Sequence, residues 1–356
     1  MRLTSFSYKT FGWELTEMSP LDTTNLLVGK NASGKTRIIM ALQNVTNFMQ
    51  MKPAVFVDKE FKVKMSFDDV LSEGWKMTYS FDIAKDCVVS ESLTVNGKSL
   101  IRRSADKAIF YKDSVNPPLD KLLVQIRRDK TAYPQVEALM EWVEGVISVS
   151  SSNINNFTLI LGGTSPFVNP LPFSTLVDAL GKEGKKYVLE NARALGYDIL
   201  DIYTMKASGE MTFVTIRERY SKQVIADFQL SNGMIRVLYI LCFLEYIRHN
   251  RKHSLLLIDD LGEGLDYNRA TSLGNIVFDS CEKENLQLIA SSNDSFMMDV
   301  VDIRKWQILR RKNSKLNVLN HINASELFNS FLLTGLSNFD LFASDYIDSY
   351  LAHSER

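Results

Sequence analysis

The chain has 356 residues, 45% of them hydrophobic, and its 41 Lys and Arg residues nearly balance 42 Asp and Glu residues, for a formal charge of −1. This composition supports a large buried core and excludes the overall basic field of a nonspecific nucleic-acid binder, although a local basic patch stays open. No apolar run is long enough for a membrane span or an export signal, so we expect a cytoplasmic protein without membrane contact.

The N-terminal half is predicted to be rich in strands. Short alternating segments at residues 3–8 and 13–15 predict two strands, and an apolar strand at 26–28 leads through a glycine-rich loop into a helix. The period-2 pattern of residues 54–111 predicts an antiparallel sheet, with VNGK at 95–98 as a hairpin turn. Two further elements are expected: a strand at 121–128 and a helix at 133–149.

Strands and helices alternate in the C-terminal half, after a Ser-, Asn-, Gly- and Pro-rich stretch at 148–172 that predicts a mobile loop. This alternation predicts parallel pairing with strand 26–28. No heptad pattern is sustained, which excludes a long coiled-coil arm. The expected elements are a helical region at 174–195, three strands within 197–228, a helix at 230–250, a buried strand from 255, a helix near 268–284, a strand at 285–294 and the segment WQILRRK at 306–312.

Residues 29–36, GKNASGKT, match the phosphate-loop pattern G-x-x-x-x-G-K-[ST] at every fixed position, between a strand and a helix. In this motif, N–H groups at a helix N-terminus surround the β-phosphate, Lys35 neutralises β- and γ-phosphate charge, and Thr36 ligates Mg²⁺. The sequence therefore predicts a nucleotide site. Its residues in this loop are Gly29, Lys30, Asn31, Ala32, Ser33, Gly34, Lys35 and Thr36.

A second anion site is predicted at LSNGMIR, residues 230–236. Leu-Ser-x-Gly, then an apolar helix, then the acidic strand end LLLIDD reproduce the order of the signature and Walker B motifs of ABC-type ATPases. Ser231, the backbone of Gly233 and the helix N-terminus can cap a γ-phosphate that another subunit holds.

Residues 255–266, LLLIDDLGEGLD, are similar to the Walker B pattern hhhhDEPxxxLD. By this comparison Asp259 holds the Mg²⁺ water shell, Asp260 takes the catalytic position, and Asp266 lies in the D-loop, which crosses a dimer interface. The next strand ends in SSND, with Asn293 at the switch position where a histidine often contacts γ-phosphate. Asparagine can donate a hydrogen bond to an anion but cannot carry a proton.

Together, LLVGKNASGKT, LSNGMIR, LIDDLGEGLD and SSND, with the N-terminal LTSFSYKTFGW, resemble the AAA-type ATP-binding proteins of the RecF/SMC/OLD branch of the ABC ATPase superfamily. The resemblance implies an α/β fold, an ABC-type P-loop NTPase head with a mixed sheet, an antiparallel β subdomain and a helical lobe. It also implies ATP and Mg²⁺ as cofactors, a homodimer joined through an ATP sandwich, and roles in DNA repair, chromosome maintenance or anti-phage defence. The expected division is a single head at 1–320, with lobe I at 1–128 plus 254–320 and the helical lobe at 129–253, and a C-terminal helical segment at 321–356.

Four positions depart from the family pattern or lack a clear signal. Asp260 stands where a glutamate is usual, and its arm is one methylene shorter. Catalysis responds to displacements of about 1 Å, so this arm could cost on the order of 100-fold in rate, and we expect a slow ATPase. Glu263 is a substitute base, Gln125 is the candidate for the Mg²⁺-sensing glutamine of the Q-loop, and Ala32 replaces a usual glycine.

Three functions are compatible with these motifs. The first is an ATP-gated switch that closes on ATP and controls a separate effector protein, a nuclease or toxin. The second is a RecF-like repair ATPase that binds DNA through basic clusters. The third is a transporter ATPase subunit, against which the missing Q-loop pattern, Asn293 and the antiparallel insertion argue. The basic clusters are Arg102/Arg103, Arg127/Arg128/Lys130, Arg248/Arg251/Lys252 and Arg310/Arg311/Lys312.

Other residue types have no assigned chemistry. The histidines and cysteines lack metal-ligand or redox spacing and are read as surface, helix-end or buried groups. They are His249, His253, His321, His353, Cys87, Cys242 and Cys281. Aromatic residues near the C-terminus are read as core packing of terminal helices, with a partner-docking motif as the alternative; they are Phe328, Phe331, Phe339, Phe342 and Tyr346.

Overall fold

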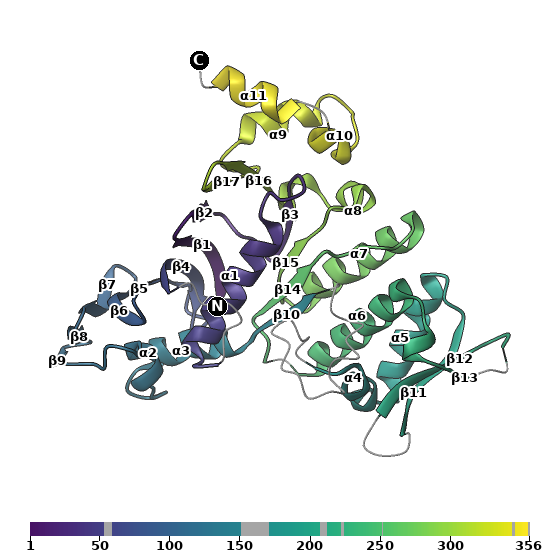
Figure 1. Cartoon of the computed structure of the whole chain (residues 1–356), viewed down its shortest axis with the longest axis horizontal. Coiled ribbons are helices and arrows are strands. Elements are labelled where there is room, and N and C mark those ends of the chain that lie inside the picture. The colour runs from purple at the N-terminus through teal and green to yellow at the C-terminus, as the bar shows by residue number, and fades with distance from the viewer. Residues whose placement is uncertain are drawn as a thin grey trace.

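The computed structural model describes residues 1–52, 59–150, 171–206, 212–221, 224–250, 252–343 and 346–354. Most of the predicted loop at 148–172 lies outside these residues. Within them, a large mixed sheet forms the body of the molecule, and a small antiparallel sheet lies apart from it with its own helices (Figure 1). The predicted fold class, an α/β head with a mixed sheet, an antiparallel β part and a helical lobe, is confirmed.

Over the described ranges, the large sheet has fourteen strands. In sheet order they are β10 (Val146–Ser150), β14 (Leu255–Asp259), β15 (Gln287–Ser291), β3 (Thr24–Val28), β16 (Trp306–Lys312), β17 (Lys315–Leu319), β2 (Trp13–Met18), β1 (Arg2–Thr10), β4 (Glu60–Val70), β5 (Trp75–Ala84), β6 (Cys87–Val95), β7 (Lys98–Ser104), β8 (Lys107–Phe110) and β9 (Asp113–Val115).

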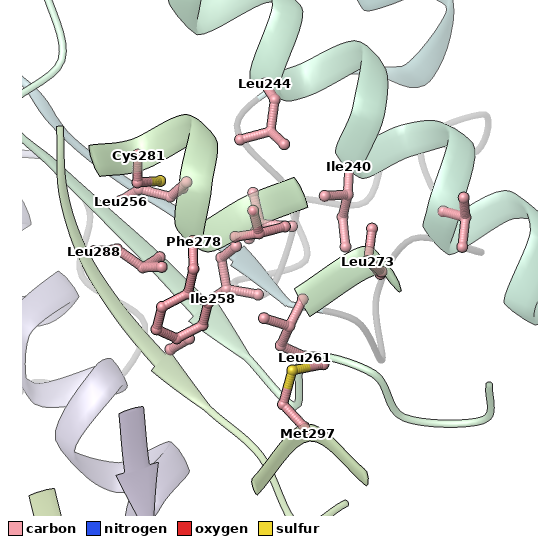
Figure 2. Packing of buried hydrophobic residues seen from close by; sticks show 14 of the residues in the cluster. Ile240, Leu244, Leu256, Ile258, Leu261, Leu273, Phe278, Cys281, Leu288 and Met297 are labelled. Atoms are coloured by element: carbon pink, nitrogen blue, oxygen red, sulfur yellow. The ribbon is translucent and has the colours of Figure 1, made fainter. Parts of the chain in front are cut away.

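The strands from β10 to β16 in this order pair in parallel, as the alternation of strands and helices predicts. Every residue of β3, β14 and β15 is buried. In β14, Leu255 and Leu257 pack in the core on the side of α1 (Lys35–Met49), while Leu256 and Ile258 pack with α7 (Tyr267–Lys283) on the other side (Figure 2). The parallel strands therefore end at one common edge, where loops can meet.

The strands beyond β2 pair antiparallel and confirm the sheet predicted for residues 54–111. The predicted hairpin turn joins β6 to β7, and its two central residues, Asn96 (φ 46°) and Gly97 (φ 78°), both have left-handed backbone. This is the geometry of a type I′ turn, whose twist matches that of the strands.

The strand predicted at residues 121–128 was wrong, because the chain forms a short helix there, α2 (Leu123–Ile126). The buried carboxylate of Glu91 accepts hydrogen bonds from the backbone N–H groups of Leu123 at 2.7 Å and Val124 at 3.2 Å. These two N–H groups have no partner inside the helix, so a side chain from a distant strand stabilises the helical turn against the local pattern.

Helix α3 (Pro134–Glu144) confirms most of the helix predicted at 133–149. The chain then leaves the helix at Gly145 and forms β10, which pairs with β14. Residues of α3 share the hydrophobic core of α1 and the antiparallel strands. The sheet lobe therefore extends to β10, past the boundary that we expected at residue 129.

Gly145 allows this close junction, and alanine there is expected to destabilise the fold. A Cβ atom would lie 2.6 Å from the carbonyl oxygen of Lys252 and 2.8 Å from the backbone nitrogen of Ser254. Backbone atoms cannot rotate away from the added methyl group, so we expect Gly145→Ala to lower the free energy of unfolding by about 1–3 kcal/mol. Thermal unfolding of Gly145→Ala measures this loss of stability. Gly181→Ala is the control, because a Cβ atom at Gly181 meets nothing within 4 Å. Equal unfolding midpoints for the two variants would contradict this reading.

In the residues that the structure describes, the second lobe consists of three helices and the three-stranded antiparallel sheet, as the pattern of residues 174–250 predicts. Its elements are α4 (Phe173–Ala179), α5 (Lys182–Ala194), β11 (Ile199–Lys206), β12 (Thr212–Glu218), β13 (Val224–Ala226), the 3-10 turn η3 (Asp227–Gln229) and α6 (Asn232–His249). Helix α6 is mostly buried, and its Ile240 belongs to the same core as Leu273 of α7 (Figure 2).

The C-terminal segment is helical and lies beyond β16 and β17 (Figure 1). Phe328 and Phe331 are buried in the core, and the ring of Tyr346 packs on Phe331 at 5.4 Å, which favours core packing for these aromatics. The side chain of Phe342 lies outside the described residues. The remaining helices are α8 (Ser295–Val300), η4 (Ile303–Lys305), α9 (Ser325–Leu332), α10 (Asn338–Ala343) and α11 (Tyr346–Ser354). In the part of the chain that the structure describes, no helix has the length and apolarity to cross a bilayer.

Candidate functional site

The phosphate loop joins the end of β3 to α1, which begins at Lys35. Ala32 (φ 62°) and Gly34 (φ 111°) have left-handed backbone, so the loop turns tightly onto the helix N-terminus. The buried Lys35 donates a hydrogen bond from Nζ to the carbonyl oxygen of Gly29 at 2.6 Å. Burial lowers the pKa of Lys35, and nearby aspartates oppose this effect.

This loop has the features of a phosphate site. The hydroxyl of Ser33 is buried and has no hydrogen-bond partner among the described residues. It lies so close to Gly29 that a Cβ atom on Gly29 would lie 2.4 Å from the Ser33 oxygen. Lys30, Asn31 and Ala32 are exposed at the tip of the loop. An orphan hydroxyl beside a lysine and a helix N-terminus fits an anionic ligand.

Asp259 lies at the end of β14 and meets two hydroxyl groups from other elements. Its Oδ1 accepts hydrogen bonds from the Thr36 hydroxyl at 3.2 Å and from the Ser291 hydroxyl at 2.6 Å. Burial raises the pKa of Asp259, while these two hydrogen bonds lower it. Hydroxyl and carboxylate oxygens suit Mg²⁺, so Thr36 and Asp259 are the residues that would hold it.

Asp260 follows directly and has left-handed backbone, with φ 54°. Its N–H donates to the Ser291 hydroxyl at 2.9 Å, and the amide of Asn293 donates to its carboxylate at 3.5 Å. Burial, then Asp259 and Glu263, raise the pKa of Asp260 to about 6, against the charge of Lys35. A half-buried carboxylate beside the phosphate-loop lysine can accept a proton from a water molecule.

A family model described as "AAA domain, putative AbiEii toxin, Type IV TA system" matches residues 24–299. The chain belongs to this AAA-domain family. The chain is also similar in fold to solved heads of SMC proteins, which supports the fold expected from the resemblance to the RecF/SMC/OLD branch. Its phosphate loop and β14 both lie within the matched residues. A search of curated proteins found no match.

The solved structures share the fold at low sequence identity. One is titled "Crystal structure of the SmcHead bound to the C-winged helix domain of ScpA"; it is 13% identical with a TM-score of 0.57, and the match covers 90% of the ATPase and 98% of that chain. Another is an Smc head domain with an extended coiled coil bound to the C-terminal domain of ScpA derived from Pyrococcus furiosus. It is 12% identical with a TM-score of 0.55, over 93% of the ATPase and 99% of that chain.

The signature segment of the ATPase packs against the loop that follows β14. Ser231 is exposed, and its side chain caps α6 by accepting a hydrogen bond from the N–H of Met234 at 3.3 Å. A Cβ atom on Gly233 would lie 3.3 Å from the carbonyl oxygen of Gly264. The N-terminus of α6 is thus held beside the D-loop with its capping serine facing solvent.

Asp266 and Glu263 lie in the same loop and have partners within the chain. Asp266 is exposed, caps α7 by accepting from the N–H of Arg269 at 3.1 Å, and pairs with the Arg269 guanidinium at 2.6 Å. Glu263 is exposed and lies 3.4 Å from the guanidinium of Arg236. The Glu263 carboxylate therefore faces a cation, which favours its charged form over the uptake of a proton.

The structure does not bring Gln125 together with the other predicted metal ligands, Thr36 and Asp259. Its amide donates to the carbonyl oxygen of Phe48 at 2.8 Å and its oxygen accepts from the N–H of Leu122 at 2.7 Å. Phe48 stands at the far end of α1, about 18 Å from Thr36 at the rise of an α-helix. Gln125 therefore connects α2 to the end of α1.

Ser291 was missed by the sequence analysis. Its hydroxyl donates to Asp259 and accepts from the N–H of Asp260, so it connects the metal and base positions. The available signal was a serine at the end of β15, the parallel neighbour of β14.

Carboxylates pair with at least one cation in each of the four basic clusters. Arg103 is buried near Glu91, Arg128 pairs with Glu137, Arg248 pairs with Glu245, and Arg310 pairs with Asp348. Arg251 lies outside the described residues. A paired cation offers less charge to a nucleic-acid phosphate than an unpaired one does.

Proposed function

We propose that this ATPase is an ATP-gated dimeric switch with slow turnover. The observation that carries the proposal is the division of the catalytic groups between two places. Thr36, Asp259 and Asp260 meet at the phosphate loop, whereas the signature Ser231 is exposed on the side of the D-loop. Two copies facing each other would bring the serine of one to the phosphate loop of the other.

Hydrolysis at this site would use the groups that meet at the strand ends. Lys35 neutralises phosphate charge, and Mg²⁺ on Thr36 and Asp259 would neutralise charge on the β- and γ-phosphates. Asp260 accepts the proton of the water whose oxygen bonds to the γ-phosphorus, as the bond to the β-phosphate oxygen breaks and ADP leaves. Asn293 orients the Asp260 carboxylate. The short aspartate arm and the incomplete monomeric site both support slow turnover.

The output of the switch is proposed to be a separate protein, an effector such as a nuclease or toxin, in anti-phage defence or DNA repair. The family description names a putative toxin and a toxin–antitoxin system, and both solved SMC heads are bound to a domain of a second protein, ScpA, in their titles. Direct engagement of DNA, as in a RecF-like repair ATPase, is the alternative output.

Mixing two inactive variants tests the shared site. In Lys35→Ala the phosphate loop is disabled, and in Ser231→Arg the signature is blocked, so each variant alone should have no ATPase activity. Random exchange of subunits gives half mixed dimers, each with one intact site, so the mixture should recover about one quarter of wild-type activity. Each variant mixed with itself is the control. No recovery under conditions of subunit exchange would contradict a composite site.

A further inference from the structure

The C-terminal helix α11 contacts the phosphate loop. The carboxylate of Asp348 pairs with the ammonium of Lys30 at 3.8 Å and with the guanidinium of Arg310 at the end of β16. Ile347, one residue earlier, is buried in the core, and the hydroxyl of Tyr346 donates to Ser330 at 2.9 Å. The start of α11 is therefore anchored, and Asp348 is held on the loop.

A cavity of about 260 Å³ lies between these elements, and it is bounded by the phosphate loop, the last residues of β16 and α11. Three cations and one carboxylate contribute to its wall: Lys30, Arg310, Arg311 and Asp348. The carboxylate of Asp348 therefore lies among these cations and pairs with two of them, Lys30 of the phosphate loop and Arg310.

The order of the strands places this contact opposite the catalytic carboxylates. Asp259 ends β14 and Asp260 follows it, and β14 lies beyond β15 on one side of β3, while Arg310 lies in β16 on the other side. A nucleoside triphosphate in the phosphate loop would lie between the two groups. Its negative charge would repel Asp348 and compete with it for Lys30 and Arg310.

We propose that α11 is a latch, which Asp348 holds on the phosphate loop and which a bound nucleoside triphosphate releases. The latch rests on the proposed function, because it needs the loop to bind ATP. Since coupling between two binding events is reciprocal, the closed latch weakens nucleotide binding by the same factor by which nucleotide loosens α11. Release of α11 would uncover Phe331 of α9, which is now buried and on which the ring of Tyr346 packs at 5.4 Å, to a partner protein only when nucleotide is bound.

The first test measures nucleotide affinity in the full chain. Binding of a fluorescent, non-hydrolysable ATP analogue with Mg²⁺ is compared for wild type and Asp348→Asn. The ion pairs are partly exposed, with 41% of the Asp348 side chain accessible, so the variant should bind about two- to tenfold more tightly. Glu326→Gln is the matched control, because it removes one exposed carboxylate from α9, away from the cavity wall, and should leave the affinity unchanged.

The second measurement is amide hydrogen exchange of the peptide that contains α11. In wild type the analogue should speed this exchange, whereas in Asp348→Asn exchange should already be fast without nucleotide. Equal affinity of wild type and Asp348→Asn, or exchange of α11 that nucleotide leaves unchanged or slows, would overturn the latch. Loss of analogue binding in both chains would contradict the proposed function itself, and the latch with it.

Discussion

Asp260→Asn is expected to abolish measurable ATP turnover while ATP still binds. Asparagine has the same size and also adopts the left-handed backbone that residue 260 requires, with φ 54°, so the fold of the loop should persist. It cannot accept a proton from water, and loss of a general base costs about 100- to 10,000-fold in rate. Steady-state phosphate release measures turnover, and equilibrium binding of a fluorescent ATP analogue measures affinity, which should change little.

Two further variants sharpen this test. Asp260→Ala should be as inactive as Asp260→Asn, and turnover that survives both changes would remove Asp260 from the mechanism. Glu263→Gln is the control for the alternative base, because Glu263 is exposed and lies near Arg236. It should retain most of the activity if Asp260 is the base.

The left-handed backbone also gives a physical reason for the departure from glutamate. Aspartate and asparagine tolerate positive φ better than longer side chains do, because their short polar groups bond locally. Here the Asp260 carboxylate lies near the Asn293 amide and its N–H bonds to Ser291. The departure at position 260 is therefore matched by the local geometry, which the sequence pattern alone does not reveal.

The phosphate loop and its fold context could be predicted because their signals are local. GKNASGKT is contiguous, and its strand and helix adjoin it in the chain. The meeting of Thr36 with Asp259 could be expected as well, since parallel strands β3 and β14 end at the same edge. Apolar strand segments that alternate with helices along the chain were enough to predict this parallel pairing.

Tertiary contacts decided the elements that were predicted wrongly. Residues 121–128 alternate like a strand, but the distant Glu91 carboxylate satisfies the N–H groups that start α2. Helix α3 ends at Gly145, and the next residues add an edge strand to β14, although Val143 and Ile147 continue the helical spacing. A local sequence pattern contains no information about a hydrogen-bonding partner that lies so far along the chain.

Arg103→Met is expected to destabilise the fold by about 3–5 kcal/mol, because it leaves the buried Glu91 without its cation. The guanidinium also donates to three carbonyl groups, those of Ala105 at 2.8 Å, Lys121 at 2.6 Å and Pro118 at 2.7 Å. It therefore holds the segment before α2 on the sheet. Urea unfolding followed by tryptophan fluorescence measures the loss.

Arg102→Met is the matched control for this prediction, because Arg102 is the exposed neighbour on the same strand and should lose little stability. A similar loss in both variants would mean that Arg103 contributes no more than a surface arginine. Burial already raises the pKa of Glu91, and removal of the guanidinium should raise it further. A carboxyl pKa that is higher in the folded than in the unfolded chain means that folding takes up a proton. The loss of stability in Arg103→Met should therefore become smaller as the pH falls toward the ordinary pKa range of glutamate. If the stability lost in Arg103→Met did not depend on pH, the loss would be due to the three carbonyl hydrogen bonds and not to the charge interaction with Glu91.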